Sequence, residues 1–89
     1  MRAIVTVVGK DKVGIIANVC SRLAAYNINI LDISQTVIDG FFNMIMITDI
    51  SAATIPLAEI SKAMAEEGQE HGMSVRIQRE DIFDAMHRI

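Results

Sequence analysis

The chain has 89 residues, 52% of them apolar, and a net charge of −3. This length predicts a single domain, and the apolar share excludes an intrinsically disordered protein. One cysteine cannot form an internal disulfide, which excludes a disulfide-stapled secreted domain and favours a cytoplasmic location. The negative charge and the lack of a long uncharged run indicate no nucleic-acid partner and no membrane span.

The first half predicts a strand, a helix and a hairpin. Residues 2–9 are a nearly continuous β-branched run, typical of a central strand buried on both faces. A helix is expected over about residues 13–26. Its main apolar stripe comprises Val13, Ile16, Ala17, Cys20, Leu23 and Ala24, and a second strip comprises Ile15, Val19 and Tyr26.

Residues 28–38 predict the next strand, with a change of phase that indicates a β-bulge near Ile30 and Leu31. Asp39-Gly40 between two apolar runs predicts a tight hairpin. The returning strand covers residues 41–49, and both of its faces are apolar, so we expect both to be covered.

The second half repeats the order helix then strand. Thr54 is the expected cap of a helix with Pro56 in its first turn. Gly72 ends that helix, and residues 73–79 alternate as a strand with one polar face. Residues 80–89 predict a short terminal helix. Its apolar face, a candidate interface, comprises Ile82, Phe83, Met86 and Ile89.

Right-handed crossovers place both long helices on one face of the sheet. The expected fold is therefore α+β, a ferredoxin-like βαββαβ two-layer sandwich with an antiparallel sheet of order 4-1-3-2 and an extra C-terminal helix. Residues 1–79 form the domain, and residues 80–89 form a helical extension of it. The other sheet face has no layer of its own, and either the terminal helix or a second subunit is available to cover it.

The turn at residues 9–14, with sequence GKDKVG, is the most informative motif. It lacks the Lys and Ser/Thr that a phosphate-binding loop requires after its second glycine, so nucleotide binding is excluded. The helix that follows presents free N–H groups, which attract a carboxylate. Asp11 would then accept the ammonium group of the same amino acid. The alternative is that Asp11 only caps the helix.

The residues from Gly9 to Ala17, followed one helix later by Asn29-Ile30, resemble the ACT domain. The resemblance covers about residues 2–79, and the whole chain is most similar to stand-alone bacterial ACT-domain proteins. It implies a regulatory, allosteric domain that pairs edge to edge as a homodimer and binds an amino acid at the interface.

The resemblance also implies the roles of four ligand-binding residues. Gly14 allows the close turn, Asp11 is a polar contact, Asn29 binds through its amide, and Ile30 binds through its backbone. Some amino-acid-binding members have a histidine where this chain has Gly9. That departure favours the alternative, a ligand-free dimerisation or protein-interaction module.

The chain offers no catalytic machinery, and we expect a protein that is not an enzyme and needs no cofactor. Cys20 has no evident base, so a nucleophilic mechanism has no candidate. Asp81, Asp84 and His87 share a helix, but such a pattern is usually a solvated face, and no metal site is predicted. The signal of a regulatory domain would pass to a partner protein that the sequence does not identify.

Overall fold

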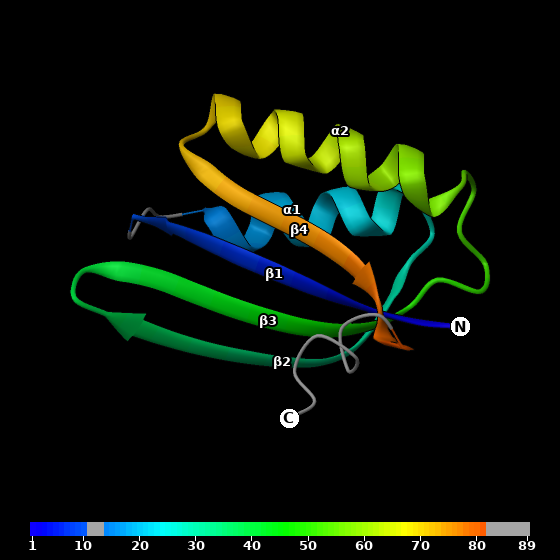
Figure 1. The fold of residues 1–89 in the computed structure, drawn as a ribbon, viewed down its shortest axis with the longest axis horizontal. Coiled ribbons are helices and arrows are strands. Elements are labelled where there is room, and N and C mark those ends of the chain that lie inside the picture. Colours follow the sequence, from blue (N-terminus) through cyan, green and yellow to red (C-terminus); the bar gives the residue numbers. More distant parts are fainter. Residues whose placement is uncertain (11–13, 82–89) are drawn as a thin grey trace.

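A computed structural model describes residues 1–10 and 14–81, and of Ile15 and Ile16 only the backbone. The elements follow the expected order. They are β1 (Arg2–Lys10), α1 (Ile15–Ala25), β2 (Asn29–Ile38), β3 (Phe41–Asp49), α2 (Leu57–Glu70) and β4 (Met73–Arg79). The sheet order is β2-β3-β1-β4, and every neighbouring pair is antiparallel. Both helices cover one face, which confirms the ferredoxin-like sandwich (Figure 1).

The core lies between the helices and the sheet. Residues that pair across antiparallel strands point to the same face, so Val5, Met46 and Ile77 share the helix side. Their exposed fractions are 0%, 0% and 7%. β1 lies between β3 and β4, which confirms that its β-branched run forms a central strand.

The hairpin and the bulge are where the sequence predicts them. Asp39 and Gly40 both have positive φ, 51° and 81°, as a two-residue hairpin turn of the primed type requires. The register between β2 and β3 shifts between Ile30 and Asp32, so Leu31 is the extra residue of a β-bulge.

The predicted inner stripe of α1 is confirmed at Leu23 and Cys20 and wrong at Ala17 and Ala24. Val13 and the side chains of Ile15 and Ile16 lie outside the described residues. Val19 and Leu23 are buried, whereas Ala17 and Ala24 are exposed. Val19 therefore belongs to the core and not to an outer strip, and Tyr26 also packs against the core. The reason is size: alanines bury little apolar surface, so the larger Val19 and Leu23 determine which side of the helix faces the sheet.

The predicted cap of α2 is also wrong. Pro56 occupies the N-cap position, and no side chain caps this end of the helix. The Thr54 N–H instead donates to the Tyr26 carbonyl at 3.1 Å, which joins this loop to the end of the first crossover. The stretch before α2 is thus held by backbone contacts to a distant turn.

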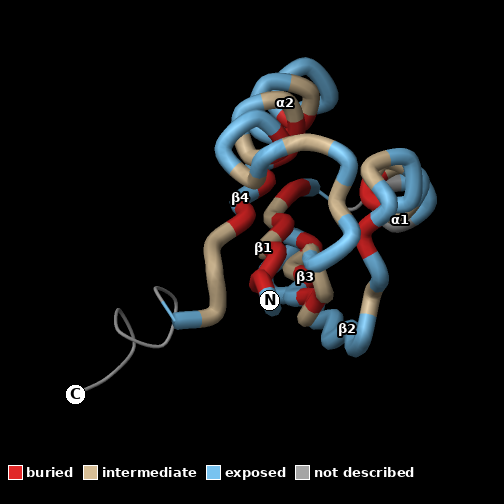
Figure 2. Tube along the Cα trace, turned by 90° about the vertical axis from the view of Figure 1, so that its right-hand side faces the viewer, coloured by how far each residue is buried: buried red, intermediate tan, exposed pale blue. Residues whose placement is uncertain are grey.

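Only one face of β3 is covered by α1 and α2. Met44 and Met46 are fully buried on the helix side, while Phe41 and Ile45 on the opposite side are 45% and 44% exposed. Covering of the second face by the terminal segment or a second subunit therefore stays a prediction. We call the side away from α1 and α2 the open face (Figure 2). The predicted terminal helix lies mostly outside the described residues, since the structure describes its start, Glu80 and Asp81, and no more.

Candidate functional site

The turn between β1 and α1 depends on Gly14. Its φ of 93° lies in the left-handed region, which a residue with a side chain rarely adopts. A Cβ at this position would meet nothing within 4 Å, so the requirement for glycine comes from the backbone conformation and not from lack of space. The Gly14 carbonyl accepts the Asn18 N–H at 2.9 Å, and α1 begins here.

The N-terminus of α1 carries no acidic group among its described residues. Gly14 is the N-cap, no side chain forms a cap hydrogen bond, and the first turn contains no acid. An uncapped helix N-terminus holds partial positive charge and unpaired N–H donors. Such an end favours a carboxylate ligand. Asp11 lies outside the described residues.

Asn29 and Ile30 form the start of β2. The Asn29 side chain is exposed, and Ile30 is half-buried and packs against the core. The bulge directly follows Ile30 and leaves Leu31 without a partner on β3. A bulge interrupts the hydrogen-bond ladder of a strand, so backbone groups here are open to another molecule.

One chain does not bring Gly14 and Asn29 together. Asn29 pairs with Asp49, which pairs with Arg2, at the start of β1. Gly14 follows Lys10, at the other end of β1. Lys10 lies eight residues after Arg2, which is about 26 Å along the strand. The α1 helix runs back along the sheet between them (Figure 1). Among the described ligand contacts, Gly14 therefore lies at the opposite end of the sheet from Asn29 and Ile30.

β2 is a long edge strand with little protection. Nine of its ten residues are exposed, since only Ile30 is half-buried. Its large exposed apolar side chains are Leu31, Ile33, Val37 and Ile38, between 38% and 60% exposed. The strand carries one charge, Asp32, and no lysine or proline. Soluble proteins usually protect such an edge with charges, prolines or a cover.

The resemblance to the ACT domain implies edge-to-edge pairing but does not identify which edge of the sheet pairs. The signal was present: apolar residues occur on both parities of residues 28–38, although an outer strand needs only one apolar face. We call residues 29–38 the β2 edge.

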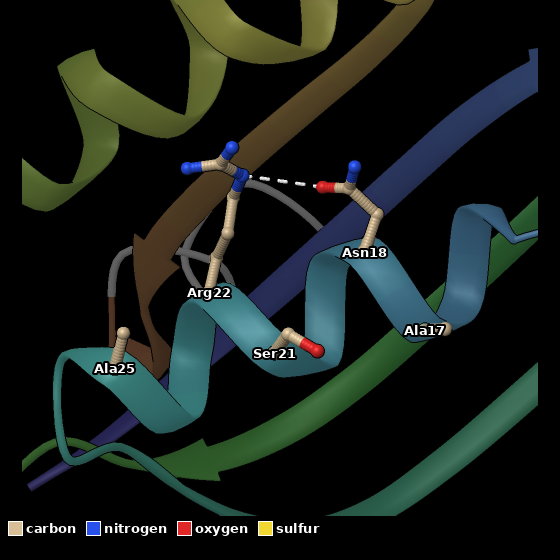
Figure 3. Close-up of a pocket in the computed structure, with 5 residues that line it drawn as sticks. All are labelled: Ala17, Asn18, Ser21, Arg22 and Ala25. Carbon is tan, nitrogen blue, oxygen red and sulfur yellow. Dashed lines mark hydrogen bonds between the residues drawn. The ribbon is translucent and has the colours of Figure 1, made fainter.

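A separate groove of about 390 Å³ lies along α1. It is lined by Ala17, Asn18, Ser21, Arg22 and Ala25 (Figure 3). The Arg22 Nε donates to Asn18 Oδ1 at 3.2 Å, and its guanidinium forms an ion pair with Glu67 of α2. Arg22 is thus engaged both within α1 and across to α2, and we assign no ligand to this groove.

The described part of the chain contains no group of three His, Cys, Asp or Glu side chains placed to hold a metal ion. No helix within residues 14–81 is long and apolar enough to cross a bilayer. Cys20 is half-buried against the core.

The two-layer βαββαβ fold is that of a small ferredoxin-like domain. A sequence profile of the ACT domain matches residues 2–78. The chain therefore belongs to the ACT domain family, a family of regulatory ligand-binding domains. ACT domains commonly dimerise and bind small-molecule effectors.

Relatives of the same length support this assignment. The chain is 49% identical to a UPF0237 protein of Listeria monocytogenes and 51% identical to one of Clostridium acetobutylicum, each across 100% of both chains. Among solved structures, the ACT domain protein from Streptococcus pneumoniae superimposes with a TM-score of 0.83, at 39% identity and over 94% of each chain.

Proposed function

We propose that this protein is a stand-alone regulatory domain that pairs with a second copy through the β2 edge. In this proposal it binds an amino acid or a similar small metabolite between the copies and passes the signal to a partner protein. The observation that carries the proposal is that Gly14 follows the end of β1, whereas Asn29 lies in the row of the start of β1, and these two rows are about 26 Å apart along the strand.

An antiparallel pairing of two β2 edges removes that separation. Asn29 starts the edge and Ile38 ends it, and Ile38 lies in the same row as Phe41 and Lys10. A two-fold axis at the middle of the edge places Asn29 of one copy beside Ile38 of the other. Asn29 of the first copy therefore also lies at the end of the sheet where the second copy has Gly14. Such a symmetric contact forms two equivalent sites.

The groups gathered in this way suit a molecule with a carboxylate and an ammonium group. The α1 N-terminus contributes N–H donors for the carboxylate. The Asn29 amide both donates and accepts hydrogen bonds, and the bulged backbone after Ile30 adds carbonyl and N–H groups. Asp11 is the group proposed for the ammonium.

A thermal-shift screen against the proteinogenic amino acids tests the proposal. A ligand at about 100 times its Kd stabilises by about 2.7 kcal/mol, which raises the melting midpoint of a domain of this size by about 10–20 °C. Asn29→Ala should abolish that shift. Asn43→Ala is the matched control, because Asn43 donates to the Phe41 carbonyl of its own strand and should leave the shift unchanged. Equal shifts in both variants would refute the assignment of Asn29.

The alternative is a ligand-free dimerisation or protein-interaction module. The β2 edge favours it, because the edge is apolar and exposed whether or not an effector is bound. The same screen separates the two functions. A dimer that responds to no amino acid supports the module, whereas a shift lost in Asn29→Ala supports the effector site.

A further inference from the structure

The β2 edge consists of an irregular start and a regular segment. The register with β3 shifts between Ile30 and Asp32, whereas from Asp32 to Ile38 every residue has its own partner on β3. The regular segment is therefore residues 32–38, and its central residue is Gln35. Because a bulge interrupts the hydrogen-bond ladder, a strand that adds to this edge fits the regular segment best.

Two exposed apolar residues lie symmetrically about Gln35. Ile33 pairs with Met46 and Val37 pairs with Phe42, and both β3 residues are buried on the helix side. Ile33 and Val37 therefore point to the helix side as well. They are nevertheless 38% and 59% exposed, so α1 and α2 leave an apolar margin of the sheet uncovered along β2.

Symmetry restricts how a second copy pairs with this edge. A two-fold axis between two antiparallel strands of one sheet keeps both helix layers on the same side of that sheet. Residues directly opposite each other then point to the same face, and a shift by one residue would turn every side chain to the other face. The axis must therefore pass beside one residue that lies opposite its own counterpart.

We infer that this residue is Gln35, and that the β2 edge is built to receive a second copy in that register. Ile33 of each copy then lies opposite Val37 of the other, and Ser34 lies opposite Thr36. Pairs of β-branched residues stabilise a sheet, as do pairs of hydroxyl side chains. The four apolar side chains form one layer on the helix side, and the hydroxyl groups meet on the open face.

Other axis positions match the edge less well. An axis at Ser34 would place Ile33 opposite the polar Gln35. An axis at Ile33 would bring Leu31, the extra residue of the bulge, into the ladder between the copies. The axis at Gln35 uses all of residues 32–38 and leaves the bulge outside.

The symmetry of the apolar margin also identifies the occupant. Ile33 and Val37 stand two residues before and two residues after Gln35. A two-fold contact needs such a pattern, because the same surface must complement itself, whereas a strand from another protein would not require it. This register rests on the proposed pairing of two β2 edges. It keeps Asn29 of one copy at the Ile38 end of the other.

Single-cysteine variants in a Cys20→Ser background test the register. Gln35→Cys should form a disulfide between copies on mild oxidation, because opposite Cα atoms are about 4.5–5.5 Å apart, within the range of a disulfide. Ser34→Cys and Ile33→Cys are the controls. In this register the two Ser34 positions are offset by two residues and lie about 8 Å apart, which is too far. Non-reducing gels measure the yield of linked dimer.

A charge exchange tests the same register without cysteines. Ile33→Lys alone and Val37→Glu alone should each weaken the dimer by about tenfold or more, measured by sedimentation velocity. The double variant should recover most of that loss, because each lysine then lies opposite a glutamate of the other copy. An axis at Ile33 would place like charges opposite each other and would give no recovery.

The failure of the register and the failure of the proposed pairing are distinguishable. More linked dimer from Ser34→Cys or Ile33→Cys than from Gln35→Cys, or no recovery in the double charge variant, would overturn the register while the edges still pair. A parent dimer that gives no disulfide at any of the three positions would show that the β2 edge is not the interface. A monomeric parent would refute the pairing itself, and either result overturns the register too.

Discussion

Replacing Gly68 with alanine tests how closely α2 packs on β4. Gly68 lies on the buried side of α2, in line with Ile60 and Met64. An added Cβ would lie 2.8 Å from the Cγ2 of Val75 and 3.1 Å from the carbonyl oxygen of Met73. The 2.8 Å contact requires Val75 to move, and the 3.1 Å contact requires Met73 to give by a few tenths of an ångström; both residues belong to β4.

Two effects oppose each other in Gly68→Ala. Alanine is favoured over glycine inside a helix by about 1 kcal/mol. Overpacking a buried site costs about 1–3 kcal/mol. The upper half of that range applies here, because Val75 is β-branched and 5% exposed and Met73 contributes backbone, so neither yields easily. The net effect is a loss of about 1–2 kcal/mol, which lowers the melting midpoint by at least about 4–8 °C.

Thermal and urea denaturation of purified variants measure this loss. Gln69→Ala is the matched control: its side chain is exposed on the same helix, and it should stay within about 0.5 kcal/mol of the parent. A Val75→Ala background removes the 2.8 Å contact with Cγ2 and leaves the 3.1 Å contact with the Met73 carbonyl, so Gly68→Ala should cost less there than in the parent. A higher midpoint for Gly68→Ala alone would refute the close approach of helix and strand.

Three further results are expected. Gly14→Ala should cost about 1–2 kcal/mol because of its left-handed backbone, and Gly14→Asn should cost less; equal denaturation midpoints would contradict this conformation. Val37→Lys should favour the monomer in sedimentation velocity, whereas Ser74→Lys on the opposite edge should not. Hydrogen bonds from the Ser51 hydroxyl and backbone N–H lower the pKa of Asp49 below 3.8. The stability that the Asp49 carboxylate contributes is therefore complete above about pH 3.8 and is lost as the pH falls through its lowered pKa. The melting midpoints of the parent and of Asp49→Asn should converge in an acid titration.

Local rules were enough to predict the connections of this fold. The turn at Asp39-Gly40 follows from the φ values that only such residues adopt readily, and the bulge at Leu31 follows from a change of parity in one strand. Both features depend on a few neighbouring residues. The sheet order then follows from the handedness of the crossovers.

Features that depend on distant contacts were predicted less well. The phase of α1 depends on which side of the helix meets the sheet. Packing buries Val19, which was predicted on the outer strip, and leaves Ala24, which was predicted on the inner stripe, exposed. Thr54 has the chemistry of a cap, yet its backbone is held by Tyr26, which lies 28 residues earlier in the chain. No local pattern in residues 50–56 specifies that contact.

The separation of the candidate ligand contacts follows from topology alone. In a β-α-β unit the two strands run parallel, so the residue after the first strand and the residue at the start of the second lie at opposite ends of the sheet. Gly14 and Asn29 occupy these two positions. A motif that uses both therefore either forms two unrelated half-sites or requires a second chain. An exposed apolar edge that begins at Asn29 favours the second chain, because the strand that carries one half of the site is also the strand that needs a partner.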